Sequence, residues 1–124
     1  MATSLRFNWS LKIIGAPPKL LAPNSPAIVG KSEVGPWVAG YFEAYSTQWE
    51  KTTLEFVVSG DWAFERYAYK VVDTPRSGGD AVADTGNGIN IYHLDADGTW
   101  RVARDAWVPT IPACGCYRRR TAAW

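Results

Sequence analysis

The sequence predicts one α+β domain, in which a sheet of antiparallel strands is covered on one face by a helix. Two observations predict it: a helical pattern of apolar residues near residue 40, and an alternation of polar and apolar residues through most of the chain that follows. With 124 residues, 47% of them hydrophobic, the chain is long and apolar enough to bury a core.

The first element expected is a strand over residues 4–14. Polar and apolar side chains alternate strictly there, which is typical of a half-buried strand. Because a lone strand exposes an unpaired edge, we expect this segment to join a sheet edge or to cross to a partner chain. The alternative is an unpacked remnant. Residues 15–30 contain four prolines and two glycines, which predicts an irregular extended loop.

A helix is expected over residues 36–47. Apolar residues recur three and four positions apart, as on one face of an amphipathic helix. These residues are Val34, Trp37, Val38, Tyr41, Phe42 and Tyr45. Pro36 fits such a helix only near its start, where backbone N–H groups have no intrahelical partner.

Four strands are expected after the helix. The alternation places them at residues 52–59, 61–73, 81–94 and 99–108. A polar loop over residues 74–80 and a turn over residues 95–98 separate the last three strands. The chain beyond Pro109 shows no periodicity.

Charge and cysteine content argue against several function classes. The net charge of +1 favours neither nucleic acid nor an anionic membrane as a partner, and no run approaches the ~20 apolar residues of a membrane span. The N-terminus does not resemble a secretory signal. Cys114 and Cys116 are too close together to join distant elements, and His93 is the sole histidine. We therefore expect free thiols in a reducing cytoplasm, with no metal and no cofactor.

Three segments carry a resemblance to a known superfamily. They are PNSPAIVGKSEV (23–34), SGDWAFERYAY (59–69) and DADGTWRVARDAW (95–107). In this order and spacing they resemble SnoaL-like proteins of the nuclear transport factor 2-like superfamily, which also contains ketosteroid isomerases, limonene-epoxide hydrolases and polyketide cyclases. The resemblance implies a cone-shaped, curved antiparallel sheet wrapped round helices, a deep and partly apolar pocket, and commonly a dimer.

The resemblance also divides the chain. The segments expected are an atypical strand segment over 1–17, a SnoaL-like domain over 18–109 and an irregular tail over 110–124. Members of the superfamily usually begin with a long helix that closes the wide end of the cone. Here the corresponding residues alternate like a strand, so we expect the pocket to lack a wall unless a partner chain or the tail supplies it.

The register expected for the last hairpin places Asp105 in the pocket. If residues 95–98 form a four-residue loop, Gly88 lies opposite Asp105. The residues sharing its face are then Arg101, Ala103, Trp107, Gly86, Asn90 and Tyr92. The opposite face carries an apolar strip, where we expect a homodimer interface: Trp100, Val102, Ile89 and Ile91. A slip of one residue in the turn would exchange the two faces.

Asp105 is the first candidate for chemistry. Arg104-Asp105 is similar to the W-R-D segment of limonene-epoxide hydrolases, whose aspartate activates water, and Arg66 falls where that family keeps an arginine. We therefore expect both residues at the pocket floor as catalytic groups. Asp105 would act as general base on a carbon acid or on water, with Arg66 tuning its charge. The alternative is a buried ion pair that only orders the sheet.

Other functional positions of the family do not carry over. The second aspartate of limonene-epoxide hydrolases is Ala68 here, and their tyrosine and asparagine fall at about Leu20 and Ala22. Because epoxide opening needs a proton donor as well as a base, epoxide hydrolysis is not expected. The proton-shuttling aspartate of ketosteroid isomerases falls near Leu21. Asn90 lies close to their second oxyanion donor and stays a candidate ligand contact.

The sequence thus predicts a small-molecule binding protein or minor enzyme with an apolar pocket. The expected ligand is small and apolar or amphipathic. The residues expected to contact it are Asn90, Tyr92, Trp107, Phe64, Tyr41 and Trp37. The alternative is a non-catalytic domain that acts through oligomerisation or protein interaction.

Overall fold

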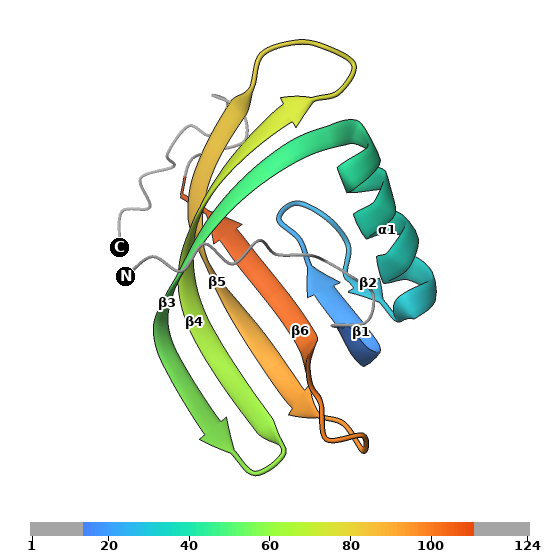
Figure 1. The fold of residues 1–124 in the computed structure, drawn as a ribbon, viewed down its shortest axis with the longest axis vertical. Coiled ribbons are helices and arrows are strands. Elements are labelled where there is room, and N and C mark those ends of the chain that lie inside the picture. Colours follow the sequence, from blue (N-terminus) through green and yellow to red (C-terminus); the bar gives the residue numbers. More distant parts are fainter. Residues whose placement is uncertain (1–13, 111–124) are drawn as a thin grey trace, which may run out of the picture.

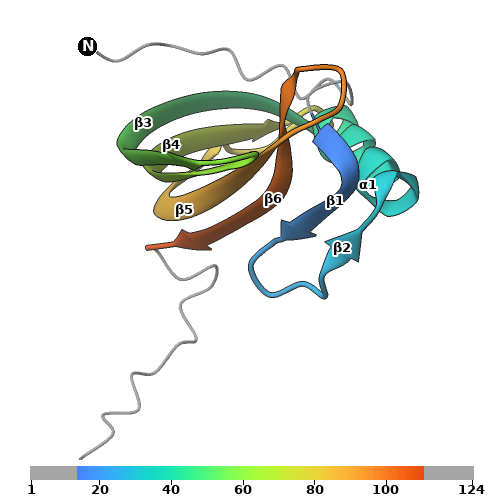
Figure 2. The ribbon, with the colours of Figure 1, turned by 90° about the horizontal axis from the view of Figure 1, so that it is seen from below.

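The computed structural model describes residues 14–110, which form a six-stranded sheet curved around one helix (Figures 1 and 2). The elements are β1 (Ile14–Leu21), β2 (Ile28–Val29), α1 (Lys31–Ala44), β3 (Tyr45–Ser59), β4 (Trp62–Pro75), β5 (Val82–Leu94) and β6 (Trp100–Pro109). The strand order is β2-β1-β6-β5-β4-β3, and α1 contacts β1, β2 and β3. The predicted α+β class is confirmed. The strand predicted over residues 4–14 lies outside the described residues apart from its last one, as do both cysteines and the tail beyond Thr110.

Strand β1 corrects the prediction that residues 15–30 form an irregular loop. It lies between β2 and β6 and runs parallel to β6, so the sheet is mixed rather than wholly antiparallel. Pro17 and Pro18 fall between Ile14 and Lys19, where the pairing with β6 is irregular. Because proline has no N–H to donate, a strand accommodates it at such an interruption. The prolines therefore concealed a strand, which pairs with β6 at Ile14 and again from Lys19 to Leu21.

Helix α1 begins earlier than the sequence predicts, at Lys31 rather than Pro36. Gly30 precedes it with a φ of +83°, a backbone conformation that favours glycine. Glu33 Oε2 then accepts a hydrogen bond of 2.8 Å from the backbone N–H of Val29. This contact resembles half of a capping box and holds the first turn, although Pro36 cannot donate to the turn before it.

Strand β3 also begins earlier than predicted. The helix ends at Ala44 rather than Thr47, and Tyr45 already has an extended backbone. Strand β3 pairs with β4 from Tyr45 onward, and Tyr45 itself lies opposite Pro75. Tyr45 and Thr47 fit both the helical spacing and the alternation of a strand. Pairing with β4 decides between the two patterns, because tertiary contacts override local propensity.

The core consists of two clusters that face each other across the concave side of the sheet. The first joins α1 to β1 and β2 and contains Leu20, Ile28, Val34 and Val38, with Phe42 packed against it. The second lies on the sheet and contains Tyr67, Tyr69 and Val71, with Trp49 and Trp107 packed against it. Both clusters contribute side chains to the wall of one cavity.

Two glycines on β5 let two tyrosines of β4 lie across the sheet. Gly88 pairs with Tyr67 and Gly86 pairs with Tyr69. A Cβ added to Gly88 would lie 2.2 Å from Tyr67 Cζ, and one added to Gly86 would lie 2.6 Å from Tyr69 Cε1. These distances are far below van der Waals contact, so only glycine leaves room for the rings. Tyr67 can therefore reach across β5 to β6.

Replacing Gly88 by alanine should destabilise the fold by about 1–3 kcal/mol, because the added methyl group displaces the Tyr67 ring from its place. Gly40→Ala is the matched control, since a Cβ at Gly40 in α1 meets nothing within 4 Å. That control should stabilise the protein by up to about 1 kcal/mol through helix propensity. Urea denaturation of the two variants measures both effects, and equal stabilities would contradict the prediction.

Candidate functional site

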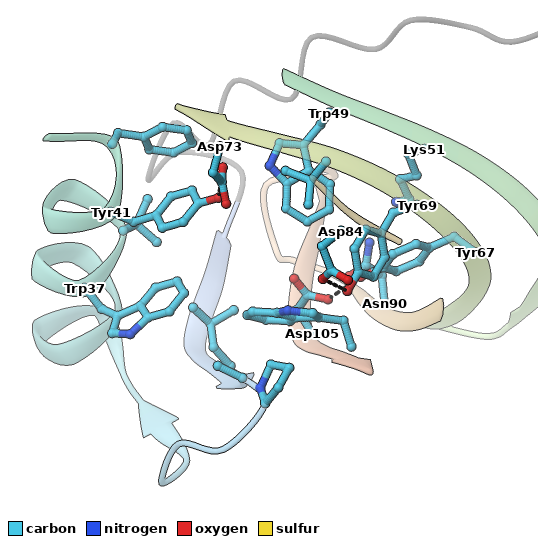
Figure 3. A pocket seen from close by; sticks show the side chains of 17 residues that line it. Trp37, Tyr41, Trp49, Lys51, Tyr67, Tyr69, Asp73, Asp84, Asn90 and Asp105 are labelled. Carbon is cyan, nitrogen blue, oxygen red and sulfur yellow. Dashed lines mark hydrogen bonds between the residues drawn. The ribbon is translucent and has the colours of Figure 1, made fainter. Parts of the chain in front are cut away.

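A cavity of about 260 Å³ lies between α1 and the concave face of the sheet (Figure 3). Aromatic side chains form much of its wall: Trp37, Tyr41, Phe42, Trp49, Tyr67, Tyr69 and Trp107. Its carboxyl, amine and amide groups belong to Lys51, Asp73, Asp84, Asn90 and Asp105. One side of the wall is formed by Leu20 of β1 and by Ala22 and Pro23, which directly follow that strand. The wall thus combines an apolar surface with a small number of polar groups, as in small-molecule sites.

Asp105 is the most deeply buried acid of the cavity, with 2% of its surface exposed. Its Oδ1 accepts a hydrogen bond of 3.0 Å from the Tyr67 hydroxyl. The Asn90 amide, oriented by its neighbours, donates to the same oxygen at 2.7 Å. Burial raises the pKa of Asp105 to about 6, against the opposing effects of the Tyr67 hydrogen bond and the Lys51 charge. At neutral pH the carboxyl is therefore mostly ionised and close to its pKa.

Asn90 connects Asp105 to a buried ion pair. The Asn90 Oδ1 accepts a hydrogen bond from Lys51 Nζ at 2.8 Å, and the same Nζ donates to Glu65 Oε2 at 2.7 Å. The hydroxyls of Thr53 and Tyr92 each donate to Glu65 at 2.6 Å. Burial raises the pKa of Glu65, but the hydrogen bonds from Lys51, Thr53 and Tyr92 outweigh it and hold the pKa below its usual value.

Two further carboxylates lie along the cavity wall. The hydroxyls of Tyr41 and Thr47 donate to Asp73 Oδ1 at 2.5 and 2.7 Å. The Tyr69 hydroxyl donates to Asp84 Oδ2 at 3.1 Å. The pKa of Tyr41 and of Tyr69 is raised, mainly by burial and secondly by the hydrogen-bonded carboxylate. Each hydroxyl therefore keeps its proton and donates a hydrogen bond. Asp84 Oδ1 is buried and accepts no hydrogen bond from the described residues.

Most of the residues predicted for the site line the cavity. These are Asp105, Asn90, Trp107, Tyr41 and Trp37. Tyr92 is outside the cavity wall, but its hydroxyl supports the network by donating to Glu65. Whether any of these side chains contacts a ligand stays a prediction.

The prediction that Arg66 shares the pocket floor with Asp105 is wrong. Arg66 is exposed on the convex face, and its Nε lies 3.4 Å from Glu55 Oε2. Phe64 also lies on the convex face, where it is 37% exposed, rather than in the pocket. Side chains alternate along β4, and the concave face takes the buried Glu65. The similarity to the family segment located the strand but not the side that Arg66 faces.

The register of the last hairpin differs by two residues from the expected one. Asn90, rather than Gly88, pairs with Asp105. One residue of the difference arises at the turn, because Leu94 pairs with Trp100. The other arises from an irregularity of the pairing beside Ile91 and Tyr92. Since side chains alternate with a period of two, the combined shift leaves Asp105 on its predicted face.

The same irregularity changes the predicted apolar strip on the convex face. Val102 pairs with Tyr92 and is only 3% exposed, so it belongs to the concave side. Trp100 lies two residues before Val102 on β6 and therefore shares its side. Ile89 and Ile91 keep their predicted place on the convex face, opposite Arg66 and Phe64 of β4.

Several residues of the site were missed by sequence reasoning. They are Lys51, Glu65, Tyr67, Tyr69, Asp73 and Asp84. The signal that could have found the β4 members is the alternation of that strand, because its odd-numbered residues share the side of the buried tyrosines. The two glycines that face those tyrosines on β5 mark the same side.

In the part of the chain that the structure describes, no helix is long and apolar enough to cross a membrane. Within residues 14–110 no group of three or more His, Cys, Asp or Glu side chains is arranged to hold a metal ion.

The Asp105→Asn variant should gain stability over the wild type as the pH rises. The pKa of Asp105 is about 6 in the folded protein against an ordinary value of 3.8, so the folded state binds the proton more tightly. Wild-type stability then falls between about pH 4 and pH 6, by about 3 kcal/mol in all. Asparagine cannot ionise and escapes this loss. Urea denaturation at about pH 4.5 and about pH 8 measures the difference, and a difference independent of pH would contradict the assignment.

Comparisons with known proteins place the fold. No protein-family model and no curated protein matches the sequence. Among solved structures, a ketosteroid isomerase-like protein from Erwinia carotovora atroseptica is 26% identical, with a TM-score of 0.75 over 82% of this chain and 79% of that chain. A conserved protein from Planctomyces limnophilus is 26% identical, with a TM-score of 0.71 over 78% and 77% of the two chains.

A third solved structure, of lower sequence identity, is also similar to this chain. A nuclear transport factor 2-like superfamily protein from Salmonella enterica is 13% identical, with a TM-score of 0.68 over 86% of this chain and 79% of that chain. The order of strands, the curved and unclosed sheet and the helix on its concave side accord with these likenesses. The chain therefore has the nuclear transport factor 2-like fold of the SnoaL-like and ketosteroid isomerase-like proteins.

Proposed function

We propose that the chain binds a small, largely apolar molecule in the cavity and that Asp105 acts on it as a general base. The observation that carries the proposal is the setting of this carboxylate. It is 2% exposed in a wall rich in aromatic rings, and Tyr67 and Asn90 fix its Oδ1 by hydrogen bonds. A carboxylate that burial has made more basic, and that cannot rotate freely, is suited to accept a proton near neutral pH.

The reaction class supported best is proton abstraction from a carbon acid. The C–H bond of the substrate breaks, an O–H bond forms on Asp105, and the electron pair is delocalised into a carbonyl group of the substrate. The proton then returns to the same or to a neighbouring carbon. The Lys51 charge lowers the pKa of Asp105, and the Asn90 amide lies between the two groups with a hydrogen bond to each. It takes the charge-tuning part that the sequence assigned to Arg66.

Deuterium exchange into ketones tests the base without knowledge of the natural substrate. The wild type should accelerate incorporation of deuterium from D₂O at the α-carbon of 2-tetralone, followed by NMR. Asp105→Asn should lower the enzymatic rate on the order of a hundredfold or more. The rate should rise with pH through about 6, where Asp105 loses its proton.

Asp80→Asn is the matched control, because it removes a carboxylate from the exposed loop between β4 and β5. Its exchange rate should equal that of the wild type. Equal rates in the wild type and Asp105→Asn would rule out Asp105 as the base. Binding of the ketone without exchange would leave only the binding half of the proposal.

A second candidate role is assembly through the convex face of the sheet. Val57, Phe64 and Ile91 are directly paired across β3, β4 and β5, and form one apolar row on that face. Val57 and Phe64 are 42% and 37% exposed, and neighbouring Ile89 is 45% exposed. An exposed apolar row on a small domain is suited to meet the same row of a second copy around a two-fold axis. We propose a homodimer of this kind.

The Phe64→Glu variant should be monomeric, because it places a charge in the centre of the apolar row. Gln48→Glu is the control, since Gln48 pairs with Val72 on the same face but outside the row. Light scattering coupled to size exclusion should give the mass of a dimer for the wild type and the control. A monomeric wild type would exclude this interface.

A further inference from the structure

One end of the cavity holds two carboxylates among aromatic rings. Asp84 on β5 pairs with Val71 on β4, and Asp73 lies on β4 two residues beyond Val71. The two carboxylates therefore belong to diagonal neighbours, with Cα atoms roughly 7–8 Å apart. The rings beside them are Tyr41, Trp49 and Tyr69, of which the last two have centroids 5.1 Å apart. In Figure 3, Tyr41 lies on the helix side of the cavity and Tyr69 on the sheet side, with Asp73, Trp49 and Asp84 between them.

The charge of this end is not balanced by the residues around it. The hydrogen bonds that Asp73 and Asp84 accept from described residues come from neutral hydroxyls. Lys51 is the one cation among the described residues of the cavity wall, and its Nζ lies 2.7 Å from Glu65. The wall therefore carries an excess of negative charge, which in a partly desolvated site favours a positively charged ligand.

Two buried polar atoms in this region have no hydrogen-bond partner among the described residues. One is Asp84 Oδ1, an acceptor whose companion Oδ2 is occupied by Tyr69. A buried acceptor left unpaired is costly, and an N–H of a ligand would satisfy it. The other is Trp49 Nε1, a donor that an acceptor on the same ligand would satisfy.

We propose that the ligand of this cavity is an organic ammonium ion. Its charged nitrogen lies between Asp73 and Asp84, against the rings of Tyr41, Trp49 and Tyr69, which attract a cation through their π faces. Its apolar body extends along the cavity toward Asp105. The inference rests on the small-molecule half of the proposed function, and it does not depend on Asp105 acting as a base.

Three probes with the same phenyl ring and different charges test the proposal. They are 2-phenylethylamine, 2-phenylethanol and phenylacetate, and isothermal titration calorimetry at neutral pH measures their affinities for the wild type. The amine should bind on the order of tenfold more tightly than the alcohol, and phenylacetate most weakly. An alcohol or a phenylacetate that binds as tightly as the amine would overturn the inference.

Variants assign the effect to the two carboxylates. Asp84→Asn keeps the shape of the side chain and should weaken amine binding on the order of tenfold while leaving alcohol binding unchanged. Asp73→Asn should do the same, and it serves if Asp84→Asn does not fold. Asp80→Asn removes the same charge outside the cavity and should leave both affinities unchanged. An unchanged amine affinity in both cavity variants would also overturn the inference.

The two proposals fail in different ways. If none of the three probes binds, both the ammonium inference and the small-molecule half of the proposed function are wrong. If the three probes bind equally, the ammonium inference alone is wrong. If Asp105→Asn loses deuterium exchange but still binds the amine, the base and the cation site are independent of each other.

Discussion

The structure depends on the need to satisfy one buried carboxylate. Asp105 lies on β6, between β1 and β5, and almost none of it reaches solvent. A buried charge is tolerated only when hydrogen bonds and opposite charges surround it. Tyr67 supplies one hydrogen bond by crossing β5 above Gly88, and Asn90 supplies another from directly across the ladder.

The same requirement extends from β6 to β3. The Asn90 amide can donate to Asp105 only while its oxygen faces a donor, which is Lys51. The Lys51 ammonium in turn requires Glu65, and the second oxygen of Glu65 is taken by Thr53. The chain of donors and acceptors thus spans four strands. Networks of this kind orient each member through the next, so the rigidity of Asp105 comes from residues that never touch it.

The sequence was sufficient for the fold class and for the side on which Asp105 lies. It was insufficient where pairing rather than alternation decides the structure. The prolines of β1 are typical of loops, and parallel pairing with β6 overrode them. The irregular pairing in β6 could not be foreseen, because Val102 and Ala103 are both apolar, both buried and acceptable on either face. The predicted face of Asp105 is nevertheless correct. The irregular pairing and the longer turn each shift the register by one residue, and a total shift of two residues leaves the face unchanged. Arg66 had no such compensation: it lies between Glu65 and Tyr67, whose buried side chains face the concave side, so alternation turns Arg66 to the convex face.

The parallel pairing of β1 with β6 has a consequence for how the chain acquires its structure. Leu20 and Asp105 are neighbours in the sheet although they stand at opposite ends of the described sequence. Closure of such a large loop opposes folding entropically, and domains rich in distant contacts fold slowly. During synthesis, β1 has no partner on this side until β6 has left the ribosome. Among the described strands, the one that carries Asp105 is therefore both the last to be made and the one that joins β1 to the rest of the sheet, so the cavity and the cooperative fold form together.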